Sequence, residues 1–187
     1  MIANDIVSCH IIWLRTIIII MLLLKELPTS KSLEKFVERY PDADIRAISD
    51  FVRLLRACSD ISMALDRLLA QHGLLQGRWW VLVLLMRQDD LTSSPSDLAE
   101  KAGVTKATMT GFIDGLEREG LVLRLPDPVD RRKFLIRLTA VGQKKLDEAM
   151  PDYYRKVHAL MSTLGAAERD AMVASVNTLA AHIDAMK

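Results

Sequence analysis

Cysteine and histidine are scarce in this sequence of 187 residues, and its net charge is close to zero. The two cysteines, Cys9 and Cys58, form no CxxC pair and no secretory framework, which indicates reduced thiols in a cytosolic protein. The four histidines lie far apart and form no spaced ligand pair, so a structural zinc site is not expected. A formal charge of +1 gives no global sign of nucleic-acid binding, so any basic surface must be local.

Motifs of catalysis are also missing from the sequence. It contains no glycine-rich phosphate loop, no nucleophile elbow and no HExxH motif. We therefore expect no catalytic residues, no metal, no cofactor and no enzyme activity. Half of the residues are hydrophobic, which allows a sizeable core, and the length suits one domain or two small intertwined ones.

The N-terminus carries a long apolar run from Ile11 to Leu24, which Arg15 interrupts. The run is shorter than the ~20 apolar residues of a spanning helix, and it lacks the basic segment and the cleavage site of a signal peptide. Three interpretations stay open: an extra helix buried in an oligomer interface, a weak anchor on a membrane surface, or a segment upstream of a natural start at Met21. We favour the first and the third, so a membrane partner is not expected.

Two helices are predicted before residue 73. A short amphipathic helix covers about Ser32 to Tyr40, and a long one runs from about Ala43 to His72 and ends at Gly73. One face of the long helix is mainly apolar, at steps of three and four residues: Ile48, Phe51, Leu54, Leu55, Cys58, Ile61, Ser62, Leu65, Leu68 and Leu69. The next segment, LLQGRWWVLVLLMRQ, is apolar almost throughout. Its length and its leucine and methionine content favour a buried helix over a strand.

The stretch LTSSPSDLAEKAGV predicts a very short helix with a well-defined start. Ser94 suits the N-cap, Pro95 the first helical position, and Asp97 the third position of a capping box, and Gly103 ends the helix. A second helix follows at once in TKATMTGFIDGLEREG and is capped by Gly120. Its buried side is predicted to comprise Met109, Phe112, Ile113 and Leu116.

A hairpin and further helices are predicted after residue 120. LVLRL and KFLIRLT have the composition of two β-strands around a turn. From Thr139 to the end the pattern is helical, and Pro151 is expected to kink or break it. The last helix carries an apolar stripe at heptad-like steps, made of Met172, Val176, Leu179 and Ile183.

The two short helices, joined by a tight glycine-containing turn, resemble a DNA-binding helix-turn-helix. The exposed side of the second helix offers short hydroxyls and one cation near its N-terminus: Thr105, Lys106, Thr108 and Thr110. Hydroxyls bond phosphates and base edges, threonine methyl groups can meet the thymine methyl group, and the helix N-terminus adds N–H groups for phosphate. Ser96, on the first short helix, is a further expected contact. Asp114, Glu117 and Glu119 would be repelled by DNA and are expected to face away or lie past the contact.

The turn of the hairpin, in RLPDPVDRRKFLIRLT, is strongly basic. Prolines and aspartates interrupt the chain, and Arg131, Arg132 and Lys133 then follow in a row. A wing beside a recognition helix can reach the neighbouring minor groove, which is narrow and negative and therefore suits arginine. Asp130 lies two residues before Arg132 and could brace its guanidinium group. We therefore predict DNA contacts from all four residues.

The stretch SDLAEKAGVTKATMTGFIDGLEREGLVLRLPDPVDRRKFLIRLTAVG resembles the winged-helix core of the multiple-antibiotic-resistance regulator (MarR) family. Its most specific pieces are GLV after the recognition helix, DPVDRR in the wing and LT..G before the next helix, and the similarity in character extends from about Asp50 to the C-terminus. The resemblance implies a cytoplasmic, homodimeric transcription regulator, and we expect a repressor. Each subunit would read one half of a palindromic operator in double-stranded DNA.

The resemblance also assigns roles to single residues. Asp130 and Arg132 match the aspartate and the minor-groove arginine of the family's wing, and the residues at 105, 106, 108 and 110 match recognition-helix contacts. Gly111 stands where many relatives carry an arginine that reaches DNA, which weakens the expected affinity or shifts the contacts elsewhere.

The expected fold is mainly α-helical with a small two-stranded β wing. We expect an apolar extension at residues 1–31, dimerisation helices at 32–72, a winged helix-turn-helix DNA-binding domain at 73–138 and dimerisation helices at 139–187. The alternative is a winged-helix protein-interaction module that does not read DNA. An exposed acidic face on the helix at 105–120 would favour that alternative.

A small aromatic or phenolic effector is a further expected partner, because relatives bind such ligands between the DNA-binding lobe and the dimer helices. Trp79 and Trp80 are adjacent and point about 100° apart on a helix, so one should enter the core and the other could face that space. Arg78 and His72 could supply polar anchors, and Met63 a soft wall. Plain core packing is the alternative for these residues.

Cys58 lies in the middle of the apolar pattern of the long helix. Some relatives sense oxidants with a cysteine in their first helix. No basic residue or helix N-terminus nearby points to a reactive thiolate here, so we predict that Cys58 is a small buried hydrophobic residue.

Overall fold

The computed structural model describes residues 28–128, 130 and 132–186. The chain divides into two compact units between Arg67 and Leu68, and each unit is described by itself. The apolar run Ile11–Leu24 and Arg131 lie outside the described residues, and so do the predictions made for them. Within the described ranges, no helix is long and apolar enough to cross a membrane, and no three potential metal ligands gather in one place.

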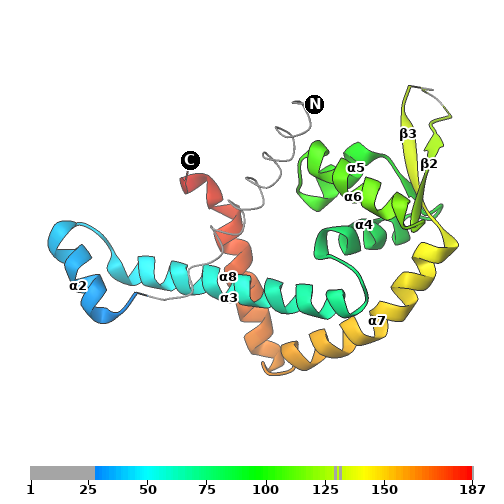
Figure 1. Cartoon of the computed structure of the whole chain (residues 1–187). Coiled ribbons are helices and arrows are strands. Elements are labelled where there is room, and N and C mark those ends of the chain that lie inside the picture. The colour runs from blue at the N-terminus through cyan, green and yellow to red at the C-terminus, as the bar shows by residue number, and fades with distance from the viewer. Residues whose placement is uncertain (1–27, 129, 131, 187) are drawn as a thin grey trace, which may run out of the picture. The chain divides into compact units, whose positions relative to one another are not determined.

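The N-terminal unit contains the two helices that the sequence predicts. Helix α2 spans Ser30–Arg39, and its N-cap Thr29 accepts a hydrogen bond from the Ser32 N–H group at 3.2 Å. Helix α3 spans Ile45–Gln71 and continues from this unit into the next one (Figure 1). Gly73 follows α3 with a φ of 67°, a left-handed conformation that favours glycine, so the predicted end of this helix is confirmed.

The apolar face of α3 is partly exposed in a single chain. The side chains on it that are 44–53% exposed are Ile48, Phe51, Leu55 and Ile61. Cys58 is exposed as well, so the prediction that it is buried was wrong, and the buried residue beside it is Ser59. The periodicity places Cys58 on the apolar face, but burial also needs an element that covers this face.

Three helices form the body of the C-terminal unit. Helix α4 spans Gln76–Met86, α5 spans Pro95–Ala102 and α6 spans Lys106–Arg118. The largest side chains with less than 2% exposure form one apolar core: Leu69, Leu74, Trp79, Val81, Leu82, Leu85, Leu98, Met109, Ile113, Leu116, Ile136 and Leu146. Burial of a large apolar side chain stabilises a fold by about 1.5–3 kcal/mol, so this core provides a rigid support for α5 and α6.

An antiparallel sheet of three strands lies beside these helices, in the order β1-β3-β2, where the sequence predicts two strands. Strand β2 spans Val122–Pro126 and β3 spans Phe134–Leu138, and they pair with Val122 opposite Leu138 and Pro126 opposite Phe134. The additional strand β1 is Thr92–Ser93, which pairs with β3. We call residues 122–138 the wing, because β2 and β3 project beyond α5 and α6 (Figure 1).

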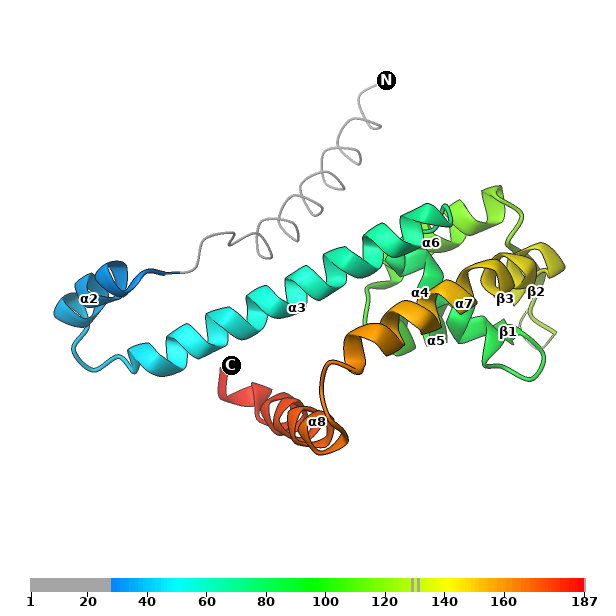
Figure 2. The same ribbon diagram turned by 90° about the horizontal axis from the view of Figure 1, so that it is seen from below.

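Two helices and a short 3-10 helix complete the chain. Helix α7 spans Ala140–Met161, α8 spans Ala166–Ala181 and η1 spans Ile183–Met186 (Figure 2). Helix α7 continues through Pro151, so a break at this residue does not occur. Pro151 lacks an N–H group and leaves one carbonyl group of the preceding turn without its helical partner, and the remaining hydrogen bonds of this long helix hold it together.

No residue of α8 is buried in the single chain. Met172, Val176 and Leu179 form the predicted apolar stripe and are 40–58% exposed, whereas Ile183 lies beyond α8 in η1 and is 61% exposed. The stripe therefore faces solvent unless another molecule covers it.

Candidate nucleic-acid interface

The predicted helix-turn-helix is formed by α5 and α6. The Ser94 Oγ accepts a hydrogen bond from the Asp97 N–H group at 3.1 Å, which supplies one half of the predicted capping box, and Pro95 occupies the first turn. Gly103 ends α5 with a φ of 65°, which glycine adopts without strain. Because α6 begins at Lys106, the connection is a tight turn.

Hydroxyl groups surround the N-terminus of α6. Thr105 is the N-cap, because its Oγ1 accepts a hydrogen bond from the Thr108 N–H group at 3.1 Å and lies 2.9 Å from the Thr108 Oγ1. The Thr110 hydroxyl donates to the Lys106 carbonyl oxygen at 2.9 Å. Thr108 is half-buried and the other three residues are exposed. The structure therefore brings the four predicted contacts together at one accessible helix end.

These hydrogen bonds determine what each hydroxyl can still offer to a ligand. A hydroxyl group has one hydrogen and two acceptor positions. Thr110 uses its hydrogen on the backbone, so it meets a ligand as an acceptor and suits the amino group of adenine or cytosine. Thr105 and Thr108 share one hydrogen between their oxygens, so one of the two keeps a hydrogen to donate to a phosphate or a base.

The opposite side of α6 anchors the helix in the core. Met109, Ile113 and Leu116 are buried as predicted, but Phe112 is only half-buried, so its predicted burial was wrong. Its ring lies at the edge of the core against Gly77 of α4, where a Cβ atom would overlap the ring. Glycine at this position allows α4 and α6 to approach closely.

The carboxylates of α6 and of its C-cap are paired with arginines from other elements. Asp114 and Glu117 both accept hydrogen bonds from Arg124 of β2, and the Arg124 Nη2 lies 2.5 Å from the Asp114 Oδ1. Glu119, the C-cap, accepts a hydrogen bond from Arg78 of α4. These ion pairs offset the negative charge that would otherwise repel a nucleic acid from the helix.

Arg124 is a site residue that the sequence reasoning did not identify. It lies two residues after the buried Val122 on β2, and alternate residues of a strand share one face. Its guanidinium carbon lies 5.2 Å from the centroid of the Phe134 ring, which belongs to the same face of β3. The signal in the sequence was a charged residue inside the otherwise apolar strand segment LVLRL.

Backbone hydrogen bonds shape the tip of the wing. The Lys133 N–H group donates to the Asp130 carbonyl oxygen at 2.8 Å, and the Asp127 N–H group donates to the Lys133 carbonyl oxygen at 3.1 Å. The Asp127 Oδ1 accepts a hydrogen bond from the Asp130 N–H group at 3.0 Å. The turn is therefore held by backbone hydrogen bonds and by the Asp127 side chain.

Asp130 holds Arg132 in the arrangement that their spacing predicts. The Asp130 Oδ1 accepts hydrogen bonds from the Arg132 backbone N–H group at 3.1 Å and from the Arg132 Nε at 3.2 Å, and the Asp130 Oδ2 lies 3.7 Å from the Lys133 Nζ. These contacts, with the Arg132 backbone hydrogen bond first, lower the pKa of the Asp130 carboxyl group. The carboxylate is thus ionised at neutral pH and directs the cation.

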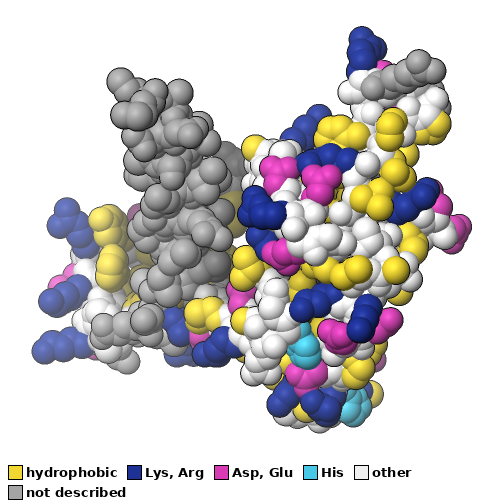
Figure 3. Space-filling model, turned by 45° about the vertical axis from the view of Figure 1, so that its right-hand side comes forward, with side chains coloured by type: hydrophobic (Ala, Val, Ile, Leu, Met, Phe, Trp, Pro, Cys, Tyr) yellow, Lys and Arg dark blue, Asp and Glu magenta, His cyan; other side chains and the backbone are white. Residues whose placement is uncertain are grey.

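Both basic side chains at the tip remain accessible. The Arg132 side chain is 91% exposed and that of Lys133 is 71% exposed, and Figure 3 shows basic side chains at the projecting end of the wing. Ser96 is exposed on the first turn of α5. The described members of the predicted DNA-binding set therefore lie at the start of α5, at the start of α6 and at the wing tip.

The two tryptophans of the predicted effector pocket have different surroundings. Trp79 is 1% exposed, and its ring centroid lies 5.3 Å from that of Tyr153 on α7. Its Nε1 is buried without a hydrogen-bond partner among the described residues. Trp80 is half-buried. One tryptophan therefore enters the core and the other stays partly accessible, as their adjacent positions on a helix predict.

The other three predicted effector residues are held by different elements. Arg78 is paired with Glu119, and the His72 Nε2 lies 3.5 Å from the Asp152 Oδ2 of α7. Met63 is half-buried and belongs to the N-terminal unit, whereas the other effector candidates belong to the C-terminal unit.

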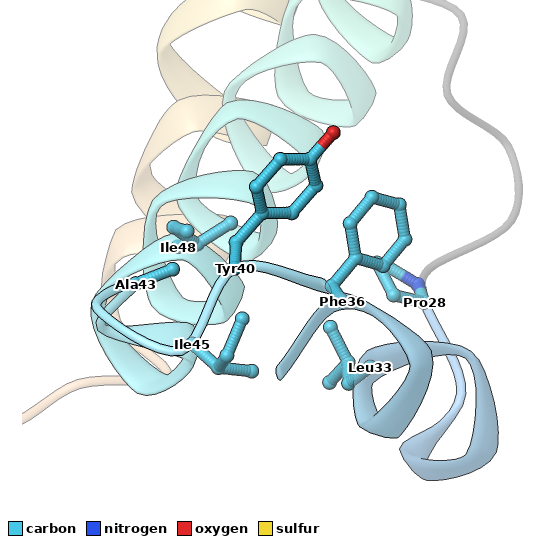
Figure 4. Close-up of a pocket in the computed structure, with 7 residues that line it drawn as sticks. All are labelled: Pro28, Leu33, Phe36, Tyr40, Ala43, Ile45 and Ile48. Atoms are coloured by element: carbon cyan, nitrogen blue, oxygen red, sulfur yellow. The ribbon is translucent and has the colours of Figure 1, made fainter. Parts of the chain in front are cut away.

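The N-terminal unit contains an apolar hollow that the sequence did not predict. Its volume is about 420 Å³, and its walls come from α2 and from the start of α3. Figure 4 shows the seven lining residues: Pro28, Leu33, Phe36, Tyr40, Ala43, Ile45 and Ile48. None of them carries a charge, so this hollow has no anchor for an ionic ligand.

Known proteins share this arrangement of helices and wing. A model of the MarR family matches residues 74–134, which run from the residues before α4 to the first residue of β3. The HTH-type transcriptional repressor YetL of Bacillus subtilis (strain 168) is 32% identical to this chain over 164 residues, which cover 88% of this chain and 98% of that protein.

Two solved structures are similar in fold. Sco3205, a MarR family transcriptional regulator from Streptomyces coelicolor in complex with DNA, superposes with a TM-score of 0.67 and 21% identity over 74% of this chain and 87% of that chain. BpsR of Bordetella bronchiseptica, whose DNA binding is regulated by 6-hydroxynicotinic acid, has a TM-score of 0.61 and 27% identity over 68% of this chain and 91% of that chain.

Proposed function

Because this chain belongs to the MarR family of transcription regulators, we propose that it is a dimeric, sequence-specific DNA-binding repressor that a small effector releases from its operator. The observation that carries the proposal is the pairing of two exposed features in one compact unit. One is the hydroxyl-rich N-terminus of α6, and the other is the wing tip with its braced Arg132.

The N-terminus of α6 enters the major groove in this proposal. Its free N–H groups and Lys106 bind phosphate, because a helix N-terminus attracts anions. Thr108 and Thr110 lie two and four residues after Lys106 and meet base edges. The Thr105 hydroxyl group is the N-cap and is already hydrogen-bonded to Thr108, so it can offer DNA only the hydrogen-bonding positions that these contacts leave open.

The wing contributes the second set of contacts. Arg132 enters the minor groove, where the potential is most negative, and Asp130 fixes its direction through the hydrogen bond at 3.2 Å. Lys133 and Arg131 add positive charge beside the phosphates.

Exposed apolar surface supports a homodimer. The stripe on α8 and the apolar face of α3 leave large side chains 40–58% exposed, including Met172, Leu179, Phe51 and Leu55. Apolar patches of this kind mark interaction surfaces. A two-fold dimer also presents two copies of α6 to half-sites about one DNA turn apart, roughly 34–36 Å. A regulator of this kind acts in the cytoplasm.

The effector is a small aromatic compound in this proposal. Support comes from BpsR, whose DNA binding is regulated by 6-hydroxynicotinic acid. Among the residues of the C-terminal unit predicted to line the pocket, Trp80, His72 and Arg78 are partly exposed. His72 and Arg78 already face Asp152 and Glu119, and Trp79 packs against Tyr153 in the core, so Trp80 is the candidate for contact with a ligand ring.

A protein-interaction module without DNA binding is the alternative function. It would be favoured by an acidic face on residues 105–120. Asp114 and Glu117 are instead paired with Arg124, and Glu119 is paired with Arg78. This neutralisation favours a helix that approaches a polyanion.

Selection of duplexes from a random-sequence library by the full-length protein tests the proposed function. We expect the recovered sequences to share an inverted repeat whose half-sites are about 10 base pairs apart, since a two-fold dimer reads both halves alike. Recovery of random sequences without a shared motif would contradict sequence-specific reading.

A further inference from the structure

Arg124 connects three elements through one side chain. Its Nη1 donates a hydrogen bond to the Glu117 Oε2, and its Nη2 donates to the Asp114 Oδ1 at 2.5 Å, both on α6. Its guanidinium carbon lies 5.2 Å from the centroid of the Phe134 ring on β3. The side chain is 29% exposed, and its Nε is buried without a hydrogen-bond partner among the described residues. A residue of β2 is thus held by α6 and β3 together.

Arginine has the shape that this position requires. Asp114 and Glu117 are three residues apart on α6, so their side chains lie on the same face of the helix. The planar guanidinium group can donate to both carboxylates at once from its two Nη atoms, whereas a lysine ammonium group is a single point charge. Asp114 and Glu117 are 48% and 37% exposed, and ion pairs at such exposure add little stability. The arrangement therefore constrains geometry more than it stabilises the fold.

The angle of the wing relative to α6 depends on where the Arg124 side chain is held. Arg124 precedes Asp130 by six residues, and a strand rises about 3.3 Å per residue, so the tip lies at most about 20 Å beyond the ion pairs. A tilt of about 10° at Arg124 would move the tip by about 3 Å, which is the whole length of a hydrogen bond. Arg132 would then lose its proposed contact with the minor groove of DNA while α6 stayed in place.

We propose that Arg124 is a positioning residue for DNA recognition. It holds the wing at the angle at which Arg132 reaches the minor groove while α6 lies in the major groove, and it shields the DNA from two carboxylates of α6. This inference rests on the proposed function of α6 and the wing, and it adds a residue that acts through Arg132 without touching DNA itself.

A double-mutant cycle between Arg124 and Arg132 tests the proposal. Arg132→Ala is measured alone, with Arg124→Met and with Arg124→Lys, by titration of the full-length protein against a duplex selected from a random library, at fixed salt. In the wild type, Arg132→Ala should raise the dissociation constant about 5–150-fold. With Arg124→Met, which removes the ion pairs, the same change should matter less than about twofold. Arg118→Ala, on the exposed last turn of α6, is the matched control and should leave the effect of Arg132→Ala at full size.

The lysine variant distinguishes the effect of the two-pronged hydrogen bonding of Arg124 from the effect of its positive charge alone. Arg124→Lys keeps the positive charge and loses the two-pronged donor, so it should behave like Arg124→Met. If lysine restores full coupling to Arg132, or if Arg132→Ala has the same effect in all three backgrounds, the positioning role is wrong. Melting curves of each variant establish that the protein remains folded.

Hydrogen exchange of the free protein provides a reading that does not depend on DNA. Arg124→Met should speed amide exchange in the wing, residues 122–138, while the amides at the buried centre of α6 stay protected. Unchanged amide exchange in the wing would contradict the claim that Arg124 holds the wing in position. If the wild type binds no selected duplex better than a shuffled one, the proposed function fails, and the exchange result still decides whether Arg124 holds the wing.

Discussion

Replacing Gly111 with arginine adds a cation to the exposed side of α6 without disturbing the core. Gly111 is exposed, and a Cβ atom built on it would meet no other atom within 4 Å. It directly follows Thr110, which belongs to the predicted DNA-contacting set. The resemblance to the MarR family implies a DNA-reaching arginine at this position in many relatives, so we expect the variant to add a DNA contact.

The substitution has an effect on stability that an alanine control isolates. Glycine inside an exposed helix is about 1 kcal/mol less favourable than alanine, and arginine ranks close to alanine. Gly111→Ala and Gly111→Arg should therefore both raise the melting temperature, by about 2–4 °C for a chain of this size. The alanine variant changes stability without adding charge.

The effect on DNA binding belongs to arginine alone. Each protomer gains about one phosphate contact, so a dimer gains two, and each contact adds about 0.9 to the slope of log affinity against log salt concentration. Between about 50 and 200 mM salt, the arginine variant should lose roughly tenfold more affinity than the wild type loses. Fluorescence anisotropy titrations of one selected duplex at four salt concentrations measure this slope. If the arginine and alanine variants share one slope and one affinity, the second turn of α6 does not face DNA.

Further predictions concern the wing, the recognition helix and the dimer. Arg132→Ala should weaken operator binding by about 1–3 kcal/mol and leave the dimer intact, and unchanged binding in a salt-controlled titration would exclude the minor-groove contact. Thr108→Ala should reduce discrimination among operator variants more than binding to random DNA. Equal losses would make this hydroxyl a backbone or capping contact. The Asp130 carboxyl group should titrate in a carbon-13 NMR experiment below the ordinary pKa of aspartate. The pKa of this carboxyl group is lowered in the folded protein. The hydrogen bonds that Asp130 accepts from Arg132 are therefore fully present above the ordinary pKa of aspartate, and they are lost as the pH falls through the lowered pKa. Sedimentation should show a dimer for the full chain and for versions that begin at Met21 or Ser30, and a monomeric full chain at micromolar concentration would contradict the dimer.

The helices and their ends were predictable because the signals are local. Ser94 as N-cap and Gly103 with its positive φ act within one turn of the chain, and the structure places both as expected. The brace between Asp130 and Arg132 is local in the same sense, since its partners are two positions apart in the sequence. Strand β1 was missed because two residues carry no periodicity, and its pairing with β3 depends on residues more than 40 positions away.

Burial and long-range ion pairs were not predictable from the pattern. Cys58 and Phe112 lie on apolar helix faces, but each is left partly uncovered by the elements around it. The partners of Arg124 are 7 and 10 residues away on another element. Periodicity gives the face of a side chain and does not say which carboxylate it will meet. Pro151 shows the opposite case, in which a strong local signal for a break is overridden by the rest of a long helix.

Two dissociation constants measure sequence-specific recognition most directly: one for a duplex selected by the full-length protein, and one for a shuffled duplex of the same length and composition. At matched salt, the wild type should bind the selected duplex at least about 10³-fold more tightly. A ratio near one, with a folded and dimeric protein, would contradict the reading of DNA by α6 and the wing.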